Sequence, residues 1–183
     1  MKLKKIKWRL LVGFVLIMVA AIGLVQVVLL KTTNEQDPIT SGSHEVNLVT
    51  DLLSLTDSSF HQFAIGDNYY TFEVVNTSFG KTQGLSGRDE IGSDGMLFVF
   101  SRPDYHGIWM KDMKFDLDLI WILDVKVVDI AKGIPAPQTQ EDALNLPIYR
   151  PKQKANLVIE VEAGFVERER VDLGAKLVYK NKE

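Results

Sequence analysis

The sequence predicts a mostly β domain, a sandwich or a barrel with one or two short helices, preceded by a single N-terminal transmembrane helix. Short apolar stretches follow one another from residue 60 onward at roughly 8–12-residue spacing, with turn-forming residues between them, which is typical of all-β domains. The stretch Leu117 to Leu123 is apolar on both faces, as expected of a strand that is covered on both sides. Residues 10–30 form one run of predominantly apolar residues without a charge and with a single amide, Gln26.

Residues 10–30 are long enough to cross a bilayer. These 21 residues carry no charge, and at about 1.5 Å per residue they span roughly 31 Å, close to the ~30 Å hydrocarbon core. The alternative is a cleaved signal peptide, because residues 19–21 (VAA) offer small side chains at a cleavage point. The apolar run continues to residue 30, which favours an uncleaved anchor. Residues 1–9 are basic and acidic residues follow the run, so we expect a cytoplasmic N-terminus and an extracytoplasmic domain at the cell membrane.

Residues 31–56 are interpreted as a linker or stalk. Residues 31–45 are polar and contain proline, glycine and serine, which predicts a flexible spacer. Val46 to Leu55 fits either a short amphipathic helix or an extended stalk, and we favour the helix. The β-rich domain is then expected to occupy residues 57–183.

The domain is expected to begin with a hairpin and a short helix. A turn at residues 66–68 (GDN) separates the apolar stretches 60–65 and 69–76, and its residues tolerate the positive φ of a tight turn. Thr77 or Ser78 provides an N-cap for the helix. Further strands are predicted at residues 96–100, 117–123, 127–130, 157–163 and 174–179.

Two connections in the second half of the domain have their own signatures. Residues 133–155 contain four prolines and are expected to form a long surface loop, and residues 164–170 fit one or two helical turns. In the strand 157–163, apolar residues alternate with Glu160 and Glu162, which predicts one wet face.

The composition excludes some partners and sites. The chain has no cysteine, so disulfides and thiolate metal sites are not available. Beyond residue 30 it carries 16 basic against 24 acidic residues, a net charge of −8. An acidic domain repels the phosphate backbone, so nucleic acid is not an expected partner.

Several short motifs occur in a fixed order between residues 72 and 179. They are Glu73 to Thr77, Gly84-Leu85-x-x-Arg88, Gly95 to Phe100, Trp109-Met110-Lys111-Asp112, Leu117-Asp118, Val127-Val128, Tyr149-x-Pro151 and Val158 to Gly164. In this order they resemble the domain-of-unknown-function family 192. The resemblance implies a compact, mostly β domain that is often exported or membrane-tethered, and it implies no established activity. The family pattern usually has asparagine where Asp112 stands and methionine where Ser86 stands.

The best candidate binding site lies around Trp109, Lys111, Asp112 and Asp118. If residues 107–111 are extended, Trp109 and Lys111 share one face. An aromatic ring beside charged groups is a common way for a cleft to hold polar rings such as sugars. The alternative is that Trp109 packs into the core while Lys111 and Asp112 form an ion pair in a turn. The sequence leaves both interpretations open.

Other chemistry has weaker support. Arg88 can hold a ligand carboxylate bidentately, although an ion pair within the domain is the more frequent use. His106 lies in a predicted loop and is a further candidate binding residue. The aspartates between residues 112 and 118 lack the glycine and the closing glutamate of a calcium loop. No catalytic residue, metal ligand or cofactor is predicted.

Three functions follow from these observations. We favour a non-catalytic module that binds an envelope component, such as a glycan, through the face of Trp109, because no catalytic motif is present. The second is a hydrolase of an envelope substrate that uses the carboxylates of Asp112, Asp116 and Asp118, together with Lys111 or His106. The third is a scaffold for another membrane protein. In each, residues 10–30 insert into the lipid bilayer.

Overall fold

The computed structural model describes residues 41–180, in which seven strands form one sheet. The strand order is β5-β4-β6-β3-β2-β1-β7, and of the paired strands only β2 and β3 run parallel. The strands are β1 (Ser59–Ile65), β2 (Asn68–Val75), β3 (Gly95–Asp104), β4 (Leu117–Leu123), β5 (Lys126–Ile134), β6 (Ala155–Glu162) and β7 (Leu177–Lys180). The helices are α2 (Ser41–Ser54), α3 (Ser78–Gln83), α4 (Gln140–Leu144) and α5 (Phe165–Arg168).

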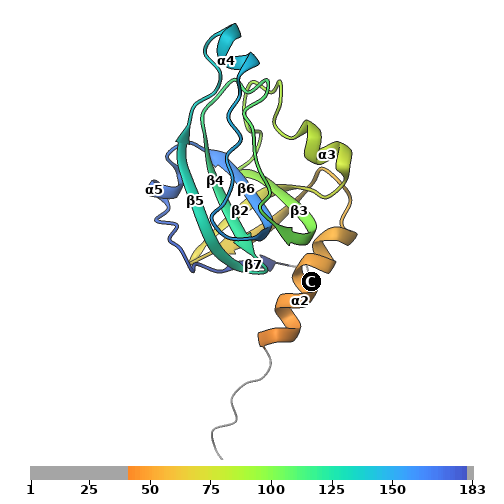
Figure 1. The fold of residues 1–183 in the computed structure, drawn as a ribbon. Coiled ribbons are helices and arrows are strands. Elements are labelled where there is room, and N and C mark those ends of the chain that lie inside the picture. The colour runs from red at the N-terminus through yellow and green to blue at the C-terminus, as the bar shows by residue number, and fades with distance from the viewer. Residues whose placement is uncertain (1–40, 181–183) are drawn as a thin grey trace, which may run out of the picture. The chain divides into compact units, whose positions relative to one another are not determined.

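The sheet curls into a half-barrel (Figure 1). Its two edge strands meet at one end, where the Val127 amide donates to the Ala175 carbonyl at 2.9 Å and the Leu177 amide to the Val125 carbonyl at 2.8 Å. The described residues therefore form a single curled sheet and not the two packed sheets of a sandwich. The prediction of a mostly β fold with short helices is confirmed in its barrel form.

The local predictions agree well with the observed elements. β1 and β2 form the predicted antiparallel hairpin, with a left-handed Gly66 (φ 61°) in its turn. β4 has the predicted bounds and is covered on both faces. β3 and β5 extend beyond the predicted stretches, to Asp104 and Ile134. α4 was not expected within the proline-bearing loop, although Thr139 and Asp142 form a capping box at its start.

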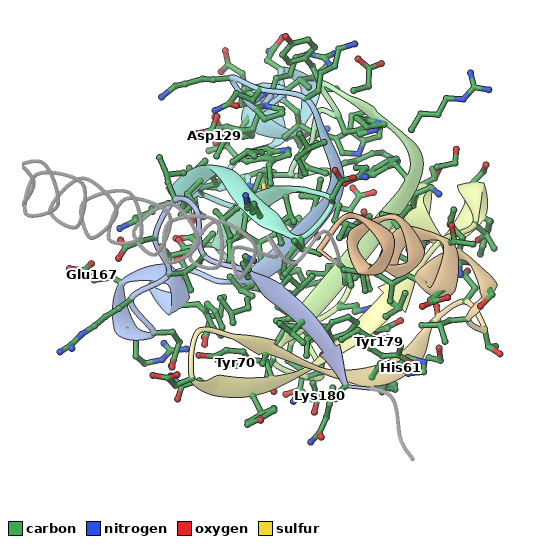
Figure 2. The ribbon with its side chains drawn as sticks, turned by 90° about the horizontal axis from the view of Figure 1, so that it is seen from below. His61, Tyr70, Asp129, Glu167, Tyr179 and Lys180 are labelled. Carbon is green, nitrogen blue, oxygen red and sulfur yellow. The ribbon has the colours of Figure 1, made fainter. Side chains whose placement is uncertain are left out.

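Apolar side chains cover both faces of the sheet. All seven strands contribute to one cluster, which is therefore the inside of the curl, and α2 and α5 add Leu52 and Phe165 to it. The second cluster lies on the outer face of β3, β4 and β6, under loops that contribute Ile108, Met110 and Met113. At the edge, the Tyr179 hydroxyl of β7 lies 3.0 Å from Nδ1 of His61 on β1 (Figure 2).

Helix α2 packs on the domain although it lies within the predicted linker, residues 31–56. Leu48 and Leu52 are buried in the inner cluster. Asn76 on the far side of the hairpin donates through Nδ2 to the carbonyls of Leu52 and Leu55, at 3.1 and 2.9 Å. A domain boundary at residue 57 therefore omits a helix that contributes to the core.

The predicted transmembrane segment, residues 10–30, lies outside the described residues. Within residues 41–180, no helix combines the length and the apolarity that a membrane crossing requires.

Candidate functional site

A cavity of about 160 Å³ lies on the outer face of the sheet. We call it the Glu160 pocket; it is lined by residues 81–86, Phe98, Phe100, residues 107–109, Met113 and Glu160. It thus brings together α3, the outer face of β3 and β6, and the loop that carries Trp109. Gly84, which caps α3, has φ 49°, and a Cβ at this position would lie 3.3 Å from Cζ of Phe98.

Glu160 lies on β6, an interior strand of the sheet between β4 and β3. Its paired neighbours are Met96 on β3 and Leu119 on β4, both of which belong to the outer apolar cluster. Only 5% of Glu160 is exposed, so the wet face predicted for β6 is wrong at this position. The physical reason is that α3 and the loop that carries Trp109 cover the outer face here.

The Glu160 carboxyl has no hydrogen bond or ion pair within the described residues. Within the described residues, every side-chain nitrogen or oxygen that is fully shielded from solvent has a hydrogen-bond partner. Because the Glu160 oxygens have none, they are not fully shielded and retain a small solvent-accessible area that faces the cavity. Burial raises the pKa of the Glu160 carboxyl to about 8, and no neighbouring charge offsets this. The group is therefore mostly protonated at neutral pH.

The other buried acidic residues of the described part have partners. Glu73 receives two hydrogen bonds from the Arg88 guanidinium, at 2.7 and 3.0 Å. Asp118 accepts from the backbone amides of Gly133, Gly164 and Val166, at 2.8, 3.0 and 3.0 Å. Of the predicted binding residues, Arg88 and Asp118 thus serve internal contacts, and neither lines the Glu160 pocket.

Trp109 lies at the mouth of the pocket and is 49% exposed. Two hydrogen bonds between the backbones of Ile108 and Tyr149, at 2.9 and 2.8 Å, hold the preceding residue in place. Lys111 lies on the same side, with Nζ 6.0 Å from the centre of the Trp109 ring. Met110 points to the opposite side and is buried.

Lys111 and Asp112 form a turn that packs against the end of α3. Their side chains make an exposed ion pair of 3.5 Å, as the alternative interpretation expected. Asp112 has φ 54°, a left-handed conformation that aspartate and asparagine tolerate better than most residues. The Asp112 carbonyl accepts from the Gly87 amide at 2.8 Å, and the Lys111 carbonyl from the Ser86 hydroxyl at 2.7 Å. These contacts position Trp109.

His106 supports the pocket from behind. Its ring stacks on Phe100 with centroids 3.6 Å apart, and its Nε2 lies 3.0 Å from the Arg102 carbonyl. Nζ of Lys81 lies 5.2 Å from the centre of the same Phe100 ring and donates to the Val99 carbonyl at 2.9 Å. Burial lowers the pKa of the Lys81 ammonium.

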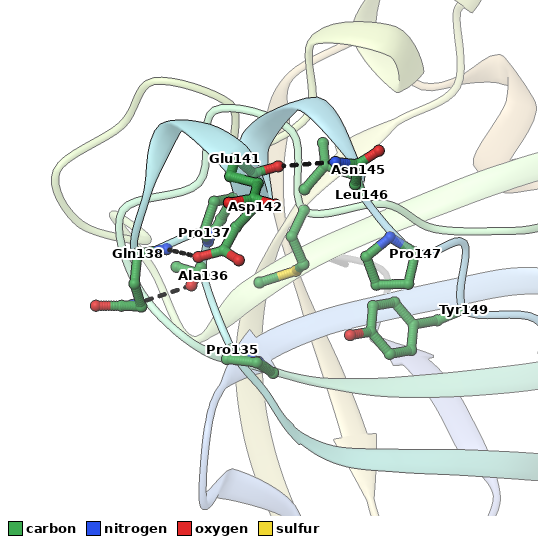
Figure 3. A pocket seen from close by; sticks show the side chains of 11 residues that line it. Pro135, Ala136, Pro137, Gln138, Glu141, Asp142, Asn145, Leu146, Pro147 and Tyr149 are labelled. Carbon is green, nitrogen blue, oxygen red and sulfur yellow. Dashed lines mark hydrogen bonds between the residues drawn. The ribbon is translucent and has the colours of Figure 1, made fainter.

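A second, larger cavity of about 380 Å³ lies under α4 (Figure 3). We call it the loop pocket; its lining consists of Met110, residues 135–138, Glu141, Asp142, residues 145–147 and Tyr149. Trp109 and Met110 therefore separate two cavities. In the loop pocket, Asp142 accepts from the backbone amides of Gln138 and Thr139, so its carboxylate serves internal contacts. No group of three or more potential metal ligands occurs among the described residues.

Sequence reasoning identified Trp109 at the mouth but missed Glu160 in the wall. The alternating pattern of β6 correctly predicts that Glu160 lies on the opposite face of the sheet from Leu157 and Ile159. Only the packing of distant segments over that face shows that the carboxyl is buried.

Comparison with known proteins places this chain among uncharacterised relatives. The sequence model of the family DUF192, described as "Uncharacterized ACR", matches residues 61–179. A structure from Sinorhizobium meliloti 1021, provisionally described as a transcription regulator, is 23% identical with a TM-score of 0.59, covering 68% of this chain and 97% of that chain. A protein of unknown function from Novosphingobium aromaticivorans DSM 12444 is 25% identical with a TM-score of 0.54, covering 64% of this chain and 84% of its own. No curated protein matches the chain. The structural likenesses support the fold and carry no activity.

Proposed function

We propose, from the premise that the chain belongs to the domain-of-unknown-function family 192, that it is a non-catalytic binding module for an envelope component such as a glycan. The ligand would lie against Trp109 and place one group in the Glu160 pocket. The observation that carries this proposal is a half-exposed tryptophan at the mouth of a cavity whose wall holds an unpartnered buried carboxyl.

The energetics of the pocket favour a ligand. The Glu160 carboxyl is largely withdrawn from water and has no partner within the described residues, so a ligand group that hydrogen-bonds with it gains a contact that no residue supplies. The half-exposed Trp109 ring offers apolar area that a ligand would remove from water. A cavity of roughly 150 Å³ accepts a molecule the size of benzene, so the Glu160 pocket, at about 160 Å³, holds one group of about that size. The remainder of the ligand would lie outside.

The positions of the carboxylates favour binding over hydrolysis. Hydrolysis of a glycosidic bond uses two carboxyl groups roughly 5–10 Å apart across the bond. Glu160 is the one acidic residue among those that line the pocket. Asp118 is enclosed by three backbone amides, Asp116 accepts from the Ala136 amide at 2.8 Å, and Asp112 pairs with Lys111.

The test is a thermal-shift screen of the full chain, in detergent micelles, against envelope glycans and their component sugars. A ligand at 100 times its Kd should add about 2.7 kcal/mol of apparent stability. Trp109→Ala should weaken binding about tenfold or more, ~1.4 kcal/mol, because the platform is lost. Phe60→Ala is the matched control, since Phe60 is similarly exposed (56%) but lies on β1, outside the pocket lining. A ligand that binds the Trp109 variant as tightly as the native chain would contradict this assignment.

The proposal includes an anchor at residues 10–30, with the domain outside the cell membrane. It is supported by the 21-residue uncharged run and by the basic residues before it. The full chain should stay with the membrane fraction after an alkaline wash. Protease added to cells whose outer envelope has been permeabilised should digest the domain. Release of the full-length chain by the wash, or protection of the domain from the protease, would contradict this topology.

A further inference from the structure

The polar side chains of the Glu160 pocket are almost fully committed to internal contacts. The hydroxyl of Thr82 donates to the Ser78 carbonyl at 2.9 Å, and the amide of Gln83 donates to the Ser86 carbonyl at 3.1 Å. The Ser86 hydroxyl and the Lys81 ammonium also bind backbone carbonyls. Among the lining side chains, the Glu160 carboxyl and the indole Nε1 of Trp109 make no hydrogen bond within the described residues, and of these two Glu160 is the acidic group.

This distribution restricts what the cavity can accept. A polyhydroxylated ring inside it would lose the water around several hydroxyl groups, and only the Glu160 carboxyl and the Trp109 indole offer side-chain partners that are not already engaged. Each hydroxyl group left unpaired costs roughly 1–3 kcal/mol. A group with a single strongly polar centre and an apolar surround avoids this cost. The rings of Phe98, Phe100 and Trp109 supply apolar surface, and aromatic faces also attract cations.

We propose that the group which enters this pocket is an organic ammonium ion, a primary or methylated amine carried by the ligand, and that its partner is the Glu160 carboxylate. The inference rests on the proposed binding function and specifies its ligand. An ammonium ion would stabilise the ionised form of Glu160, which otherwise stays protonated because it is buried without a positive partner. The described part of the chain supplies no cation to Glu160, whereas it supplies Arg88 to Glu73.

The charged groups around the pocket are compatible with a cation. On α3, the Lys81 ammonium is held by two backbone carbonyls, and its charge does not lower the Glu160 pKa, which burial alone sets. On the loop, the charge of Lys111 is compensated by Asp112. His106 stacks behind Phe100, and the strands beside Glu160 present Met96 and Leu119, which carry no charge.

Proton release on binding tests this inference. Burial raises the pKa of the Glu160 carboxyl to about 8, so the group carries a proton at pH 6 and pH 7. An ammonium ion that pairs with the carboxylate must displace that proton to solvent, and its affinity should rise about tenfold between pH 6 and pH 7 by linkage. A neutral ligand would show neither effect. Calorimetry of the full chain in two buffers of different ionisation enthalpy measures the released proton, with methylammonium, tetramethylammonium, glucosamine and N-acetylglucosamine as probes.

We expect at least one ammonium probe to bind with release of about one proton. N-acetylglucosamine should bind far more weakly than glucosamine, and Glu160→Gln should lower the affinity for the amine at least tenfold. Glu162→Gln is the control, because Glu162 is an exposed glutamate two residues along the same strand. Binding of neutral sugars that depends on Trp109 but releases no proton would overturn the ammonium inference and leave the binding function standing. Failure of every probe, amine and neutral, to bind would overturn both. The proton count on the native chain decides the matter even if the Glu160 variant does not fold.

Discussion

The native chain should become less stable as the pH rises from about 5 to about 8, and the Glu160→Gln variant should not show this pH-dependent decrease. Burial raises the pKa of this carboxyl from its ordinary 4.5 to about 8. In that interval the folded chain keeps a proton that the unfolded chain releases, so the free energy of unfolding falls with rising pH. The contribution is at most about 1.4 kcal/mol per pH unit, or several kcal/mol over the window. Glutamine has no such proton, so its contribution does not change with pH.

Urea unfolding of the native chain, Glu160→Gln and Glu162→Gln at pH 5, 6, 7 and 8 measures this effect. The difference in unfolding free energy between Glu160→Gln and the native chain should increase with pH in favour of the variant. Glu162 is exposed, so its variant should follow the native chain. Parallel curves for all three proteins would mean that Glu160 titrates as an ordinary surface carboxyl and that its pocket is open to water.

Asp118→Ala should cost roughly 3–5 kcal/mol of stability. The Asp118 side chain is fully buried and accepts hydrogen bonds from three backbone amides, two of them at the start of α5 and one in β5. Removing it leaves these donors without an acceptor, at about 1–3 kcal/mol each, partly offset if water enters. Asp118 therefore joins β4 to β5 and to the turn after β6, which is a structural role.

Asp116→Ala is the control for this prediction. Asp116 is exposed and accepts one side-chain hydrogen bond, from the Ala136 amide at 2.8 Å. Its replacement should cost about 1 kcal/mol. Urea denaturation of both variants measures the difference. Equal losses would show that the three contacts of Asp118 contribute no more than one exposed contact.

The parts of the fold that depend on local sequence were predicted well. The β1–β2 hairpin follows from a turn sequence between two apolar stretches, and β4 from a run that is apolar on both faces. α3 begins at the predicted cap, where the Thr77 hydroxyl accepts from the Gly80 amide. The parallel pairing of β2 with β3 and the contact between the edges of the sheet join distant segments, and no local pattern encodes them.

The candidate site was predictable only in part, for the same reason. Alternation along β6 gives the face on which Glu160 lies, but burial of that face depends on residues about 50–80 positions earlier in the chain. Arg88 was expected to prefer an internal ion pair, and its partner is Glu73. A role of Trp109, Lys111, Asp112 or His106 in binding stays a prediction.

The most direct measurement is an NMR titration of the isotope-labelled full chain with glucosamine, followed through the backbone amides. If the Glu160 pocket is the binding site, the shifts should concentrate at residues 81–86, residues 107–109 and Glu160, and Glu160→Gln should require at least tenfold more glucosamine to produce them. Shifts confined to the loop pocket, at residues 135–149, or no shifts at any concentration, would contradict the assignment of this site.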